Sequence, residues 1–77
     1  MSEEEIFNGE VIWFNVKLNF GFIAWKKDGK QQKDMFAHYS DIDMPGFKVL
    51  KAGQKVQFSI GKNNSGEPKA INIQILK

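Results

Sequence analysis

The sequence contains no cysteine and only one histidine, and both shortages restrict its chemistry. Without cysteine, neither a disulfide framework nor a thiolate metal site is available. The lone His38 cannot anchor a zinc site of the usual histidine-rich kind. Its one acidic neighbour on the same strand face is Asp34, and a ribonuclease needs more than one histidine. We therefore expect no metal, no cofactor, no small-molecule substrate and no enzymatic activity.

Long apolar segments are also missing, since no run approaches the roughly 20 residues of a membrane helix. The N-terminal Glu3–Glu5 run is acidic where a secretory signal would be basic and then apolar. These features predict a cytoplasmic protein without a membrane partner.

Arginine is absent, so all eleven basic residues are lysines, against nine acids. Three of those acids form the Glu3–Glu5 run, which leaves the rest of the chain basic. Lysine suits loose contact with phosphates better than bidentate recognition of base edges.

A chain of 77 residues forms one domain at most and buries about 60% of its unfolded surface. We expect one domain over residues 1–77, with residues 1–5 flexible, and nothing indicates an obligate oligomer, so a monomer is expected.

Short β-rich runs dominate the pattern, and no segment has the extended apolar stripe of a long helix. Turn residues separate the runs at Asp28-Gly29, Pro45-Gly46 and Asn63–Gly66. This pattern predicts an all-β fold, a small antiparallel barrel or sandwich. The five expected strands are Gly9–Asn15, Phe20–Lys26, Asp34–Ser40, Lys55–Gly61 and Ala70–Leu76.

Alternation along the second and third runs separates their two faces. Phe20 and Phe22 share one face, and Phe36 shares a face with Asp34 and His38. A carboxylate and an imidazole are costly to bury without partners, so this face is expected to meet solvent. The opposite face and the last two strands supply the expected core: Ile23, Met35, Ala37, Val56, Phe58, Ile60, Ile71, Ile73 and Ile75.

The first run is ambiguous, because Val11 pairs in parity with Trp13 and Ile12 with Phe14. A β-bulge could turn Trp13 outward while Val11 stays inside, but alternation does not decide this. Trp25 has inward parity at a strand end, which favours packing at the barrel rim over contact with a ligand.

A face of several exposed rings needs a binding partner. Every nucleobase offers a flat π-face to such rings, and nearby lysines attract the phosphates between stacked bases. A duplex hides its base faces, so the pattern indicates a binder of single-stranded RNA and DNA.

Four segments then carry a resemblance to a known family: "GEVIWFNVKLNFGFI", "DMFAHYSDI", "GFKVLKAGQKVQFSI" and "GEPKAINI". Together they resemble the cold-shock domain from about Gly9 to Ile75, with segments like its RNP1 and RNP2. The resemblance implies a five-stranded antiparallel OB-fold barrel and an RNA chaperone with little sequence preference, in which Trp13 faces outward. It implies the following nucleic-acid-binding residues: Trp13, Asn15, Lys17, Phe20, Phe22, Asp34, Phe36, His38, Tyr39 and Phe47.

The chain departs from the family pattern near the ring-bearing face. Ile12 stands where the family usually has lysine, and Leu18-Asn19 where it has lysine-glycine. Asparagine tolerates positive φ, so the turn at Asn19 can survive. We hypothesise that the lysine-rich loop Lys26–Lys33 compensates for the missing lysines.

Two other kinds of protein share part of this pattern. An RNA-recognition motif needs helices and places its RNP2 strand before RNP1, the reverse of the order seen here. A small β-barrel protein-interaction module that docks a peptide on its aromatic face remains the alternative function.

Overall fold

The computed structural model describes residues 5–44, 46 and 49–76 of the chain. The expected strands are present, with bounds shifted by up to two residues. The third is shortened at both ends, from Asp34–Ser40 to Met35–His38. A two-residue strand and one 3-10 turn are added to them. The elements are β1 (Phe7–Asn15), β2 (Phe20–Lys27), β3 (Lys30–Gln31), β4 (Met35–His38), η1 (Tyr39–Asp41), β5 (Lys55–Lys62) and β6 (Pro68–Ile75).

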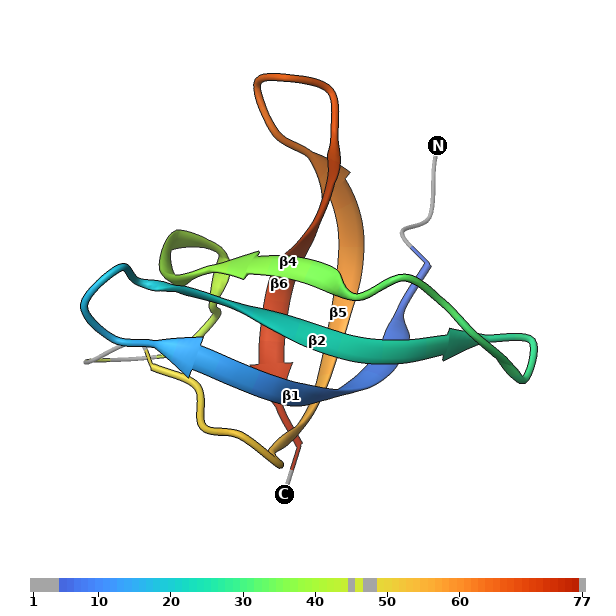
Figure 1. Ribbon diagram of the computed structural model, residues 1–77, viewed down its shortest axis with the longest axis horizontal. Helices are drawn as coiled ribbons and strands as arrows, with labels where there is room; N and C mark the ends of the chain where they lie inside the picture. Colours follow the sequence, from blue (N-terminus) through green and yellow to red (C-terminus); the bar gives the residue numbers. More distant parts are fainter. Residues whose placement is uncertain (1–4, 45, 47–48, 77) are drawn as a thin grey trace.

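The five longer strands close into a barrel, which confirms the predicted all-β OB-type fold. β1 pairs antiparallel with both β2 and β5, β5 pairs with β6, and β2 pairs with β4. The ring closes where β4 meets β6, and this one pair runs parallel rather than antiparallel. In Figure 1, β1, β2 and β4 run side by side across β5 and β6.

Residues with positive φ make the two turns at the ends of β2. Asp28 and Gly29 have φ values of 54° and 79°, the pair of left-handed residues that a two-residue hairpin turn requires. Asn19 has a φ of 64°, so it adopts the conformation predicted for it in place of glycine. In Figure 1, the two turns lie at opposite ends of strand β2.

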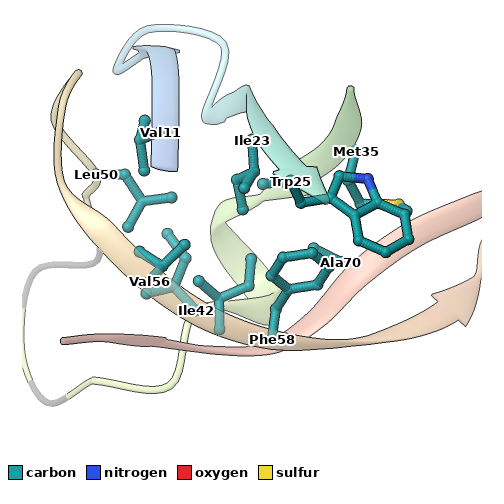
Figure 2. Packing of buried hydrophobic residues seen from close by; sticks show 11 residues of the cluster. Val11, Ile23, Trp25, Met35, Ile42, Leu50, Val56, Phe58 and Ala70 are labelled. Atoms are coloured by element: carbon teal, nitrogen blue, oxygen red, sulfur yellow. The ribbon is translucent and has the colours of Figure 1, made fainter. Parts of the chain in front are cut away.

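The barrel interior contains most of the expected core residues (Figure 2). Of those predicted, Ile23, Met35, Ala37, Val56, Phe58 and Ile73 are buried. The buried apolar cluster consists of Val11, Ile23, Trp25, Met35, Ala37, Ile42, Leu50, Val56, Phe58, Ala70 and Ile73.

Three of the predicted core residues are not fully inside. Ile60 is 38% exposed, while Ile71 and Ile75 are only half-buried. The β5–β6 register shifts between Gln57 and Ser59, and the extra residue on β6 lies at Asn72, whose φ is 51°. Phe58 and the following Ser59 are both buried, so strict alternation of burial fails at this point. Ile60 lies opposite the buried Ala70 and is nevertheless left partly exposed.

Trp25 closes one end of the barrel, as its parity predicted. Its ring centroid lies 4.9 Å from that of Phe7 and 5.7 Å from that of Phe58. Its indole Nε1 donates a hydrogen bond to the Lys33 carbonyl oxygen at 2.9 Å, so the polar atom of this buried ring is satisfied. Phe7, Trp25 and Phe58 are referred to below as the core aromatic cluster.

Membrane-spanning helices and clustered metal ligands are both absent from the described residues. Residues 5–44, 46 and 49–76 contain no helix long and apolar enough to cross a membrane. The same part of the chain brings together no group of three or more His, Cys, Asp or Glu residues that could hold a metal ion.

Candidate nucleic-acid interface

Strands β2 and β4 carry their predicted rings as directly opposed pairs on one face. Phe20 lies opposite His38, and Phe22 lies opposite Phe36. All four side chains are half-buried, whereas the residues between them on both strands are buried. The parity argument from the sequence is therefore confirmed for these two strands.

Trp13 joins this face because β1 contains a β-bulge. Val11 pairs with Ile23 and Trp13 with Phe22, so Ile12 is an extra residue on β1. Val11 is consequently buried while Trp13 is 41% exposed, the arrangement that alternation alone could not decide. The Trp13 ring centroid lies 5.7 Å from Phe20 and 5.5 Å from Phe22.

The rings form one continuous surface across three strands and the η1 turn. Neighbouring ring centroids within it are 4.9 to 6.4 Å apart, and mostly tilted or edge-to-face. The outer ends of the row are its most exposed members, and each has a relative exposure of 41%. This surface is called the aromatic platform, and it consists of Trp13, Phe20, Phe22, Phe36, His38 and Tyr39.

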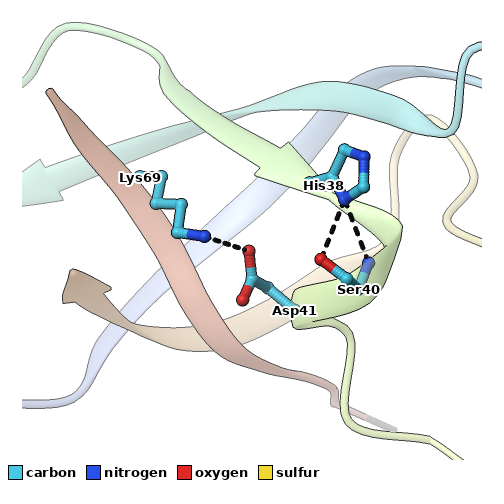
Figure 3. Close-up of polar contacts among 4 residues, drawn as sticks. All are labelled: His38, Ser40, Asp41 and Lys69. Carbon is cyan, nitrogen blue, oxygen red and sulfur yellow. Dashed lines mark hydrogen bonds and ion pairs between the residues drawn. The ribbon is translucent and has the colours of Figure 1, made fainter. Parts of the chain in front are cut away.

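Tyr39 reaches the platform from a 3-10 turn, not from a strand as predicted. β4 ends at His38, and Tyr39 and Ser40 begin η1. His38 Nδ1 accepts a hydrogen bond from the Ser40 amide at 3.3 Å and lies 2.9 Å from Ser40 Oγ (Figure 3). With Nδ1 acting as acceptor, the neutral imidazole carries its proton on Nε2. His38 thus caps the turn with one nitrogen and keeps the other as a donor.

An ion pair ties this turn to the neighbouring strand β6. Asp41 Oδ2 lies 3.1 Å from Lys69 Nζ on β6, and both side chains are more than three-quarters buried (Figure 3). The pair orients the segment that presents Tyr39, and this lysine is thereby occupied inside the structure.

The loop between β1 and β2 is organised by Asn15. Its Oδ1 accepts hydrogen bonds from the amides of Lys17 and Leu18, at 2.9 and 3.0 Å. The Asn19 amide donates to the Asn15 carbonyl oxygen at 2.7 Å. The Lys17 side chain is exposed, and so are the aliphatic side chains of Val16 and Leu18. The three exposed residues 16–18 therefore carry a single charge, that of Lys17, between two aliphatic side chains.

The lysine-rich loop forms the β2–β3 hairpin at the other end. Lys26, Lys27, Lys30 and Lys33 are all exposed there. Lys27 Nζ lies 5.9 Å from the centroid of the Phe7 ring, which places this ammonium over the core aromatic cluster.

Asp34 and Phe47 complete the predicted set. Asp34 is exposed and directly precedes β4, on the side of the platform away from His38. Phe47 lies outside the described residues, as does Pro45 of the predicted Pro45-Gly46 turn.

The prediction missed a hollow of about 580 Å³ beside Phe22 and Phe36. Its walls come from residues 32–36 and from the β5–β6 hairpin, which are distant in sequence. The turn at Asn63–Gly66 was predicted, but its sequence does not indicate that the β5–β6 hairpin lies beside the start of β4.

Comparisons with known proteins agree with this geometry. The family model described as "'Cold-shock' DNA-binding domain" matches residues 7–76. The chain is 41% identical over 70 residues to a "Cold shock-like protein" of Aquifex aeolicus, covering 91% of this chain and 94% of that protein. It is 42% identical over 67 residues to "Cold shock-like protein CspD" of Escherichia coli K12, covering 87% and 86%. It is 45% identical over 65 residues to a "Major cold shock protein" of Streptococcus pyogenes serotype M6, covering 84% and 90%. These names denote DNA-binding and cold shock proteins and no enzymatic activity.

Proposed function

Because the chain belongs to the cold-shock DNA-binding domain family, a nucleic-acid-binding and non-enzymatic family, we propose that it binds single-stranded RNA and DNA by stacking bases on the aromatic platform. The observation that carries this proposal is the ring-to-ring continuity of the platform on the outer barrel face, from Trp13 to Tyr39. The core is filled by other residues, so these rings are not required inside.

Stacking accounts for both the affinity and the breadth of binding. Each base stacked on an aromatic side chain contributes about 1–3 kcal/mol, and every base has a π-face to offer. Trp13, Phe20, Phe22 and Phe36 would each receive a base, and His38 would add stacking together with its Nε2 donor. A duplex would bind poorly because its base faces are already stacked.

Polar residues at the edges of the platform complete the proposed site. Lys17 and the lysines of the β2–β3 hairpin would follow the phosphates, and Asp34 would contact a base at the edge. Asn15 supports the loop through its Oδ1, which leaves its amide group to meet the strand. Phe47 is included from the family resemblance.

Broad, exchanging binding of this type suits an RNA chaperone. A strand held on the platform cannot pair with itself, so the protein would keep cytoplasmic RNA open for translation or transcription. We propose that residues 1–77 act as one such domain and as a monomer. The proposed stress response follows from the cold shock names of the relatives.

A fluorescence titration tests the proposal. Trp13 is 41% exposed and Trp25 only 8%, so stacking on the platform should quench mainly Trp13 emission. We expect quenching by single-stranded oligonucleotides, a smaller response to the matched duplex, and weaker binding when the salt concentration is raised. Equal binding of duplex and single strand would contradict stacking. Quenching by a polyproline peptide instead would support the protein-interaction module.

A further inference from the structure

The hollow beside the platform is called the lateral groove. It lies between the segment leading into β4 and the β5–β6 hairpin, and Phe22 and Phe36 belong to both the groove and the platform. A strand stacked on these two rings would reach the groove without a break. Its lining residues are Phe22, Trp25, Gln32, Lys33, Asp34, Met35, Phe36, Ile60, Asn63, Glu67 and Pro68.

Both walls of the groove are fixed by hydrogen bonds. On one side, the Trp25 indole holds the Lys33 carbonyl oxygen at 2.9 Å. On the other, Asn63 Oδ1 accepts from the Ser65 and Glu67 amides, both at 2.9 Å. The Asn63 backbone N–H donates to the Glu67 backbone carbonyl oxygen at 2.9 Å, and the Asn63 side-chain amide donates to Glu67 Oε1 at 3.4 Å. The groove is therefore preformed, which lowers the entropic cost of binding.

The groove combines apolar surface with carboxylates. Ile60 is 38% exposed here, and Met35 and Trp25 contribute further apolar surface. Asp34 and Glu67, both exposed, add two carboxylates to the lining, against the one ammonium of Lys33. Apolar surface suits the face of a flat ring, and carboxylates accept hydrogen bonds but offer none when ionised.

We propose that the lateral groove receives one base of the bound strand and prefers a base that carries an exocyclic amino group. Cytosine presents an N4 amino donor, which Asp and Glu accept. Uracil and thymine present a carbonyl oxygen at the same position, which would face a carboxylate as a second acceptor. They could donate to these carboxylates only through N3–H, beside that repulsive contact. A phosphate is disfavoured because it would meet the carboxylates. The groove would then give a strand bound without sequence preference on the platform one preferred position.

This inference rests on the proposed function, and its test uses cytosine and uracil because the two bases stack with similar area. The probes are octauridine and the series in which one uridine at a time is replaced by cytidine. We expect one position at which cytidine strengthens binding by about two- to tenfold, the usual effect of one hydrogen bond. The gain should disappear in the double variant Asp34→Ala, Glu67→Ala, which removes both side-chain acceptors, whereas Asn and Gln would keep an acceptor oxygen.

A matched control separates the groove from overall charge. The double variant Glu5→Gln, Asp28→Asn removes the same charge from two exposed residues that do not line the groove. It should retain the cytidine preference. Equal binding of the whole series, or a preference that persists without Asp34 and Glu67, overturns the inference and leaves the proposed function standing. Failure of octauridine to bind overturns both.

Trp25 provides a second readout. The sequence has two tryptophans, so Trp13→Phe leaves Trp25, in the groove lining, as the only indole emitter. We expect its emission to change when the preferred cytidine strand binds, and to change less with octauridine. Binding detected by anisotropy without any change in Trp25 emission would overturn the inference.

Discussion

The two faces of β2 each carry an aromatic cluster, and the clusters differ in their surroundings more than in their residues. In the core aromatic cluster, Phe58 is fully buried and Trp25 is 8% exposed, among aliphatic side chains. In the aromatic platform, Phe22 is half-buried and Trp13 is 41% exposed. Phe22 and Trp25 are three residues apart on one strand, so opposite parity alone separates them. The comparison teaches that stability and binding should respond to different substitutions of the same residue type.

The largest effect is expected where the core aromatic cluster loses its centre. Phe58→Ala would leave a cavity under Trp25 and Phe7 and should lower the free energy of unfolding by about 3–5 kcal/mol. This is a large share of the total stability of a small domain, about 5–15 kcal/mol. Urea denaturation measures it, with Phe58→Leu as the milder control. A loss below about 1 kcal/mol would show that the core tolerates the gap.

Gly21→Ala should lower both the stability of the domain and its affinity for a single strand. Gly21 lies on the buried face of β2, and a Cβ there would lie 2.2 Å from the Trp13 carbonyl oxygen and 2.8 Å from Phe14 Cα. Because these are backbone atoms, β1 would have to move, at a cost of about 1–3 kcal/mol in stability. Trp13 would be displaced as well, so both the denaturation midpoint and the affinity for an oligonucleotide should fall. A change in only one of them would contradict the close packing of β1 on β2.

Phe22→Ala and Phe36→Ala should separate the two clusters. Each should weaken binding of a single strand by about 1–3 kcal/mol for the lost stack. The free energy of unfolding should fall much less than in Phe58→Ala, because both rings are only half-buried. Titration and urea denaturation of the same preparations give the two numbers. Severe unfolding with either variant would mean that these rings are core residues.

The smallest effect is expected from the lysines of the β2–β3 hairpin. Replacing Lys26, Lys27, Lys30 and Lys33 with glutamine should reduce the dependence of log K on log salt by about 0.7 for each lysine that contacts a phosphate. Stability should not change measurably, since all four are exposed. Replacing Lys51 and Lys55 with glutamine provides the comparison at lysines outside this hairpin. An unchanged affinity and salt slope would remove the hairpin from the interface.

The outer and inner faces of β2 and β4 could be predicted from the sequence because two polar residues of the third run, Asp34 and His38, showed which face meets solvent. Asp34 and His38 share their face with Phe36, and burying both would have cost more than burying Met35 and Ala37. The same argument predicted the inward direction of Trp25. Where a polar residue marks one face of an unbroken strand, alternation is sufficient.

Alternation failed where the barrel forces a strand to bend. The bulge at Ile12 and the one at Asn72 each shift the register by one residue. Asparagine tolerates the positive φ found at Asn72, but the residue type at Ile12 gives no sign of a bulge. Each bulge depends on how β1 and β6 curve against their neighbours, which is a property of the closed barrel. The direction of Trp13 therefore could not be decided from its own strand.

Contacts between segments distant in the chain could not be predicted from the sequence either. The ion pair of Asp41 with Lys69 holds the turn that moves Tyr39 out of β4, and its partners are 28 residues apart in the chain. The lateral groove likewise needs the β5–β6 hairpin to project over the segment before β4. Local patterns predict which residues face outward but not which outward-facing segments meet.

The parallel contact between β4 and β6 has a dynamic consequence. One register pair, Ala37 with Ala70, joins the two strands, and one bridge beyond η1, Ile42 with Ile73, continues the contact with β6. The other strand pairs of the barrel share longer ladders. Segments held by few hydrogen bonds open at a lower free energy than the whole molecule unfolds. The amides along this seam should therefore exchange with solvent sooner than those between β1 and β2. His38 borders the seam, so each brief opening would loosen one end of the platform and give a bound strand a place to begin its release.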